Sequence, residues 1–226
     1  PTRRSSDLVA KTRALTVRIF IEELIRFIRN NINRELDMSE AQEIKSSVLK
    51  SANNFEAAWF VWQSFEEIKQ DLRNKLEKDI RSKLKVKKYE LKYNENFFKR
   101  GDVGNEIGIL FNELQDYCLV FGFDERWFNS FYWGICRKTK DVVKTQRAIE
   151  EIKEIMTINF GDPVDSTEIW PWSIYANGIE LDSEFLHWGK SSKPYWAMQD
   201  GSLAQKIVDI AEKVHSAFKD RMDLLM

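Results

Sequence analysis

Apolar residues recur every three to four positions over the first third of the chain, which is the spacing of an amphipathic helix. The pattern predicts one helix over residues 15–36, and Ser39, with Gln three residues later, is expected to cap a second helix. Apolar positions then continue to Leu84, and one unbroken helix of that length would span on the order of 60 Å. Asn53 and Asn54 offer a break and a new N-cap. The sequence therefore predicts two helices here, the second of them long.

The hydrophobic period changes after Leu84. Four runs are rich in β-branched and aromatic residues and are separated by Gly, Asp and Asn turns: 85–98, 105–114, 116–124 and 130–138. Their near-regular spacing predicts an antiparallel meander. Helical spacing returns over 145–158, residues 159–201 are expected to be irregular, and Ser202 is expected to cap a last helix.

Together these elements predict an α+β fold with N-terminal long helices, an antiparallel β-meander, an aromatic-rich irregular segment and a C-terminal helix. We expect residues 9–84 to form a helical region and residues 85–226 to continue the same domain. Residues 1–8 fit no structural pattern and match the translation of a common sequencing adaptor. Authentic sequence is therefore expected from about Val9, with the reading frame cut upstream of it.

The amino-acid composition argues against several classes of protein. The chain is 43% hydrophobic and has a formal net charge of −1, which argues against wholesale disorder and against a globally basic nucleic-acid binder. Cys118 and Cys136 lie in apolar runs, so reduced core cysteines are favoured over a disulfide or a metal pair. Two histidines provide no zinc ligand set. No apolar run approaches the roughly 20 residues of a membrane span, so we expect no membrane partner and a cytoplasmic location.

The densest basic run covers residues 81–88 and is the candidate nucleic-acid-binding site. Its cations could each neutralise a phosphate, which adds affinity that depends on salt but not on sequence. A solvated helix end followed by an edge strand, whose lysines discourage strand pairing, is the alternative and the favoured interpretation. The candidate residues are Arg81, Lys83, Lys85, Lys87 and Lys88.

A Glu-x-Lys pattern occurs four times, and only Glu90 and Lys92 fall on a predicted strand. On a strand, alternate side chains share one side and could together reach a metal and an attacking water, whereas on a helix they diverge by about 200°. Asp79, the nearest upstream aspartate, lies in a helical stretch. Solvated charges are the favoured interpretation, and the sequence predicts neither a catalytic residue nor a metal site.

Four of the eight tryptophans lie in the segment predicted to be irregular. They could form a stacking surface for unpaired bases or a cage for a ligand. Irregular segments also hold themselves in place by burying large aromatic side chains, and this interpretation is favoured. The residues concerned are Trp170, Trp172, Trp188 and Trp196, with Tyr175 and Tyr195.

The order of elements resembles the C-terminal part of a bacterial and phage group in the PD-(D/E)XK nuclease superfamily. The resemblance rests on an amphipathic helix around residues 20–28, the long helix after residue 55, strand-like runs at 116–124 and 131–135, and the Trp-rich stretch before a terminal helix. In that family the catalytic aspartate and the Glu-x-Lys strand precede these elements. No catalytic residue of the family can therefore be assigned to a position in this chain.

The resemblance implies Mg²⁺-dependent DNA cleavage for a parent protein and no cofactor for this fragment. The fragment would be an accessory region that engages DNA, packs against the missing N-terminal nuclease core, or forms a homo-oligomer. The alternative is a non-enzymatic interaction or oligomerisation module that uses the aromatic segment or the long helix.

Overall fold

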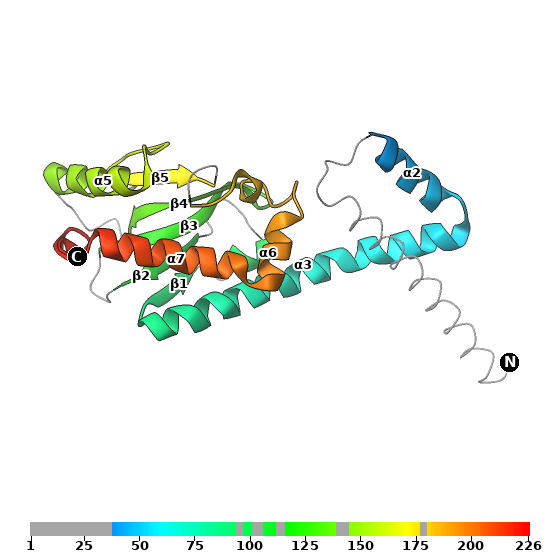
Figure 1. The fold of residues 1–226 in the computed structure, drawn as a ribbon, viewed down its shortest axis with the longest axis horizontal. Coiled ribbons are helices and arrows are strands. Elements are labelled where there is room, and N and C mark those ends of the chain that lie inside the picture. The colour runs from blue at the N-terminus through cyan, green and yellow to red at the C-terminus, as the bar shows by residue number, and fades with distance from the viewer. Residues whose placement is uncertain (1–37, 94–96, 101–105, 112–115, 139–144, 177–179) are drawn as a thin grey trace. The chain divides into compact units, whose positions relative to one another are not determined.

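The computed structural model describes residues 38–93, 97–100, 106–111, 116–138, 145–176 and 180–226 (Figure 1). The chain divides into two compact units, Pro1–Ile68 and Lys69–Met226, and each is described by itself. The helix predicted over residues 15–36 and the segment 1–8 lie outside the described residues. Helices and a five-stranded antiparallel sheet make up the described chain, which confirms the α+β class.

In the first unit, helix α2 (Met38–Leu49) precedes α3 (Ala52–Lys87), which continues into the second unit. The prediction that Ser39 caps α2 is wrong, because the helix already begins at Met38. The expected break before α3 is present, but the cap is Ser51 and not an asparagine. Its Oγ accepts the backbone N–H of Asn54 at 3.2 Å, which satisfies one of the N–H groups that a helix start leaves unpaired.

The second unit contains one sheet with strands in the order β1-β2-β3-β4-β5, every neighbouring pair antiparallel. The strands are β1 (Glu90–Tyr93), β2 (Glu106–Leu110), β3 (Tyr117–Glu125), β4 (Asn129–Arg137) and β5 (Trp172–Tyr175). The predicted meander is confirmed in its first four strands. Two details differ: residues 85–87 still belong to α3, and α4 (Phe97–Arg100) is a short helix where a strand was expected.

The segment 159–201 is more regular than predicted. It contributes β5, the 3-10 helix η1 (Ser183–Phe185) and helix α6 (Lys193–Asp200). Strand β5 forms because Trp172–Tyr175 pairs with β4, from Ile135↔Trp172 to Tyr132↔Tyr175. This pairing is a tertiary contact, and it could not be predicted from a run of only four residues beside a proline.

Helix α5 (Gln146–Phe160) confirms the helix predicted over 145–158, and Thr145 is its N-cap, since Thr145 Oγ1 accepts the N–H of Ala148 at 3.2 Å. The last helix, α7 (Ser202–Ala217), begins differently. Gly201 occupies the N-cap position with φ of 81°, and Ser202 is the first helical residue rather than the cap. The 3-10 helix η2 (Met222–Leu224) ends the chain.

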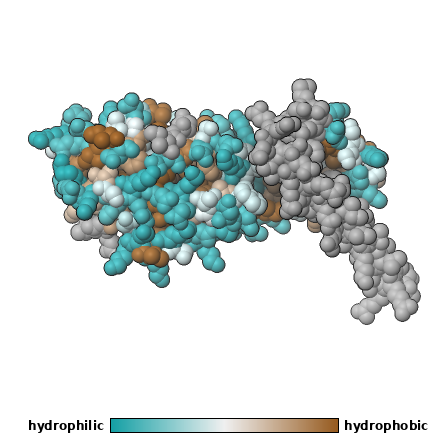
Figure 2. All heavy atoms as spheres, in the orientation of Figure 1, coloured by the Kyte–Doolittle hydropathy of each residue, from teal (hydrophilic) through white to brown (hydrophobic). Residues whose placement is uncertain are grey.

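One face of the sheet builds the core. Alternate strand residues point to this face and are almost completely buried with apolar residues of α3, α5, α6 and α7 in a single cluster. The helices thereby turn their polar sides outward, and Figure 2 shows a mostly hydrophilic surface over α7. None of the helices in the described part of the chain combines the length and the hydrophobicity that a membrane span requires. The sheet residues of the core include Ile107, Ile109, Leu119, Phe121, Phe123, Phe131, Trp133 and Trp172.

The other face of the sheet carries mainly small and polar side chains, together with the buried Leu110 and Val120. Cys118 and Cys136 are direct cross-strand partners on β3 and β4 and are free thiols in the structure. Burial raises the pKa of the Cys118 thiol to about 12, so the thiol stays protonated and weakly reactive at neutral pH. Gly122 and Gly134 leave room on this face for neighbouring groups.

Candidate nucleic-acid interface

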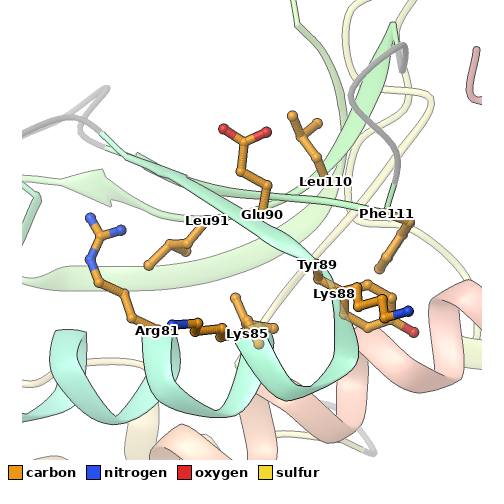
Figure 3. A pocket seen from close by; sticks show the side chains of 9 residues that line it. Arg81, Lys85, Lys88, Tyr89, Glu90, Leu91, Leu110 and Phe111 are labelled. Atoms are coloured by element: carbon orange, nitrogen blue, oxygen red, sulfur yellow. The ribbon is translucent and has the colours of Figure 1, made fainter.

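The helical geometry of α3 divides the predicted basic run between two faces. Arg81, Lys85 and Lys88 are spaced at i, i+4 and i+7, and all three line one groove beside strand β1 (Figure 3). Lys83 and Lys87 lie on another face of the helix and contact α7. The five candidate residues therefore do not form a single surface.

The two lysines on the α7 side make contacts within the fold. Lys83 Nζ donates to Gln205 Oε1 at 2.6 Å, and Lys87 Nζ pairs with Glu212 Oε1 at 2.6 Å. The hydrogen bond to Glu212 raises the pKa of Lys87. Both side chains dock the last turns of α3 onto α7, which is a structural role that a DNA-binding surface does not require.

The way α3 ends positions the groove. The N–H of Tyr89 donates to the Leu84 carbonyl at 3.1 Å and the N–H of Lys88 to the Lys85 carbonyl at 3.2 Å, the two bonds of a Schellman motif. Lys88 has a φ of 61°, in the left-handed region that favours glycine. This reversal turns the chain directly from the helix into β1, an edge strand of the sheet.

The groove has a volume of about 510 Å³, which is within the size range of ligand sites. Figure 3 shows Arg81 and Lys85 extending from α3, Lys88 and Tyr89 at the helix end, and Phe111 beyond β2. The Nε of Arg81 donates to Glu77 at 2.9 Å, which fixes the guanidinium along the helix. Arg81, Lys85 and Lys88 line the groove together with Glu90, and Arg81 is also paired with Glu77, so the three cations outnumber the two carboxylates.

Aromatic rings lie at one end of this groove. The ring of Tyr89 lies 5.0 Å from Phe111 and 5.4 Å from His215 of α7, and Phe111 lies 5.3 Å from His215. Tyr89 and Phe111 are partly exposed, so part of their surface is available to a ligand. Sequence reasoning missed both residues, because only the chain reversal after α3 brings residue 89 beside residue 111.

Glu90 and Lys92 lie on β1 with their side chains on the same side of the strand, as the pattern predicts. Asp79, however, pairs with Lys75 on α3 at 2.5 Å and does not join them. In the parts of the chain that the structure describes, no group of three or more His, Cys, Asp or Glu side chains converges to hold a metal ion. Glu90 lines the groove described above, and Lys92 lies two residues further along β1.

The aromatic segment divides into anchors and accessible rings. Trp172 and Trp188 are 0% and 1% exposed, and the indole of Trp172 donates to the Gly161 carbonyl at 2.9 Å, so the anchoring interpretation is confirmed for these two. Trp196 is 68% exposed on α6. Trp170 is half-buried and lines a small cavity beside β4 and β5.

Comparisons of the chain with protein-family models, with curated proteins and with solved structures found no match. The resemblance to PD-(D/E)XK nucleases therefore stays a prediction, and the function is argued below from the groove itself.

Proposed function

We propose that the groove between the end of α3 and strand β1 binds the phosphate backbone of DNA. In the setting that the resemblance implies, the chain is the accessory, DNA-engaging region of a metal-dependent nuclease, and Mg²⁺ and the catalytic carboxylates belong to a separate core. The observation that supports the proposal is that Arg81, Lys85 and Lys88 line the same groove, in which cations outnumber carboxylates.

The spacing of these cations suits a nucleic-acid strand. Arg81 and Lys85 are four residues apart on α3, which is about 6 Å at 1.5 Å per residue, and Lys88 follows directly after the helix end. The rise between the two helical cations corresponds to roughly two nucleotides along one strand of B-form DNA. The partly exposed rings of Tyr89 and Phe111 add an apolar surface on which a base or sugar can rest. Backbone contacts of this kind give affinity without sequence preference.

Replacing Arg81, Lys85 and Lys88 together by serine should weaken DNA binding by at least about tenfold at low salt. Each lost phosphate contact also makes the dependence of log K on log salt shallower by about 1, so the slope should change by about 3. Fluorescence anisotropy with a short labelled DNA at several salt concentrations measures both quantities.

The matched control replaces Lys83, Lys87 and Lys153 by serine, which removes the same charge from the α7 side of α3 and from an exposed position of α5. Equal loss of affinity in both triple variants would show that binding depends on total charge and would overturn the proposal for this groove.

The substitution Lys88→Gly separates binding from folding. Glycine adopts the left-handed conformation of residue 88 without steric cost, so the variant should be more stable by about 1 kcal/mol. The same change removes a groove cation and should weaken DNA binding. Urea unfolding and anisotropy on one preparation test both expectations. A variant that is more stable and binds DNA as tightly as the parent would exclude Lys88 from the interface.

A second candidate, self-association, is favoured by the first half of α3. Phe55, Trp59 and Trp62 recur at i, i+4 and i+7 and are 51%, 49% and 66% exposed, and the rings of Trp59 and Trp62 lie 4.9 Å apart. An apolar helical stripe of this kind is suited to pack against the same stripe of a second copy.

If this stripe forms a dimer, sedimentation should show a concentration-dependent dimer that Trp59→Lys with Trp62→Lys converts to monomer. The control Trp196→Lys places a charge at another exposed tryptophan and should leave the dimer intact. A monomeric parent chain at high concentration would exclude this candidate.

A further inference from the structure

A second site lies on the face of the sheet that points away from the core cluster, at the edge opposite to the basic groove. A cavity of about 150 Å³ lies there beside β4 and β5. Three aromatic rings line it, from Tyr132 of β4, Tyr175 of β5 and Trp170 of the preceding loop. Tyr132 and Tyr175 are direct cross-strand partners, and the ring of Trp170 packs edge-on to Tyr132 with the centroids 5.4 Å apart.

The loop that carries Trp170 is fixed at several points. The Trp172 indole binds the Gly161 carbonyl at 2.9 Å, and the N–H of Val164 donates to the Ser173 carbonyl at 2.9 Å. Within the loop, the N–H of Thr167 donates to the Trp170 carbonyl at 2.7 Å, and Thr167 Oγ1 accepts the N–H of Trp170 at 3.0 Å. The third ring is therefore held against the strand before any ligand arrives, which limits the entropy lost on binding.

Both tyrosines donate their phenol protons to carboxylates. Tyr132 Oη donates to Glu106 at 2.6 Å and Tyr175 Oη donates to Asp124 at 2.7 Å. Burial and then the charge of Glu106 raise the pKa of Tyr132, while the hydrogen bond to Asp124 raises that of Tyr175 to about 12. A phenol that donates to a carboxylate carries more negative charge on its ring faces, which strengthens their attraction for a cation.

The charged side chains at the cavity are all acidic. Asp124 and Asp165 belong to its lining, and the carboxylate of Glu106 lies directly behind Tyr132. No cationic side chain is among the described residues that line the cavity. The site is therefore unsuited to phosphate and differs in kind from the groove at the other edge of the sheet.

From this geometry we infer that the cavity formed by Tyr132, Trp170 and Tyr175, with Asp124 and Asp165, binds an alkylated ammonium group. Its volume is below the roughly 300 Å³ at which sites for drug-sized ligands begin, so it suits a compact head group rather than a whole metabolite. Aromatic walls with a carboxylate at the rim are the arrangement that recognises quaternary ammonium ions. The head group could be a small free ion or a methylated lysine of a peptide. The inference does not depend on DNA binding.

The test is an NMR titration of the full chain with choline, with its uncharged carbon isostere dimethylbutanol, and with a short peptide that contains trimethyllysine. We expect saturable binding of the charged ligands, with shifts of the Trp170 indole signal, and no comparable binding of the isostere. Tighter binding of the peptide identifies a protein side chain as the source of the head group, and tighter binding of choline identifies a free ion.

Two substitutions test the contribution of individual lining residues to ligand binding. Trp170→Ala should weaken binding by about tenfold. Asp124→Asn keeps the shape and the hydrogen-bonding capacity of an exposed residue and should weaken binding by about threefold. Trp196→Ala, at an exposed tryptophan outside the cavity, is the matched control and should bind as the parent does. The inference is overturned if neither charged ligand binds, if the isostere binds equally well, or if Trp170→Ala and Asp124→Asn fold and bind unchanged.

Discussion

Replacing Trp188 by alanine should lower the free energy of unfolding by about 4 kcal/mol, the range seen when a large aromatic side chain is removed from a core. Trp188 is 1% exposed and its indole meets three other rings. It lies edge-on to Phe123 at 4.8 Å, stacks on Phe128 at 5.9 Å and contacts Phe131 at 5.0 Å. The alanine would leave a cavity that the surrounding strand residues cannot fill. Urea unfolding followed by circular dichroism measures the loss.

A second substitution at Trp188 distinguishes the stability contributed by apolar packing from the cost of the buried indole N–H. The indole Nε1 of Trp188 is buried and has no hydrogen-bond partner among the described residues. Trp188→Phe removes this unpaired donor and keeps most of the apolar volume, so it should cost only about 1–2 kcal/mol. Trp196→Ala, at an exposed site, should change stability by less than about 0.5 kcal/mol. If phenylalanine destabilised as much as alanine, the aromatic contacts of Trp188 could not explain its contribution.

Replacing Gly134 by alanine should destabilise the fold by about 3 kcal/mol, at the upper end of the usual cost of overpacking. A Cβ at this position would lie 2.3 Å from the carbonyl oxygen of Trp172 and 2.8 Å from the Cα of Ser173. These are backbone atoms of β5, so relief of the clash requires β4 and β5 to separate. Thermal unfolding measures the effect as a lower melting temperature.

The control for this prediction is Gly108→Ala on the same face of the sheet. Its Cβ would meet Cys118 Sγ at 3.5 Å, an ordinary van der Waals contact, so the melting temperature should stay close to that of the parent. Equal melting temperatures for the Gly134 and Gly108 variants would contradict the close approach of β5 to β4 and, with it, the strand pairing that places Tyr175 beside Tyr132.

Some elements of the fold follow from local sequence patterns, whereas others form only through contacts between distant segments. Strands β2 to β4 and helices α5 and α7 were predictable, because each is long enough for its hydrophobic period or turn residues to be distinct. Strand β1 has only four residues and was predicted as part of a longer run, 85–98, whose ends belong to α3 and α4. Strand β5 was missed, since Trp172–Tyr175 is short, follows a proline and becomes a strand only by pairing with β4. The cap of α3 was misplaced by a few residues, the usual scale of error at helix ends.

The candidate sites show the same division. The basic run 81–88 was visible in the sequence, but the last turn of α3, which extends to Lys87, decides which cations share the groove. The sequence had ended this helix at Leu84. The Schellman motif and the pairing of β1 with β2 bring Tyr89 and Phe111 to the groove. Neither of these two structural features can be recognised from the composition of the sequence.

The sequence by itself determined the α+β class, the order of most elements and the presence of a local basic run in a nearly neutral chain, because these depend on periodicity and charge over neighbouring residues. Only the tertiary structure decided which side chains meet. Tyr132, Trp170 and Asp124 lie up to 46 residues apart and share one cavity because β3, β4 and β5 are adjacent in the sheet and the loop after α5 folds back on them. Strand pairing and loop anchoring determine which of these side chains come together, and both depend on contacts between distant segments rather than on a local pattern.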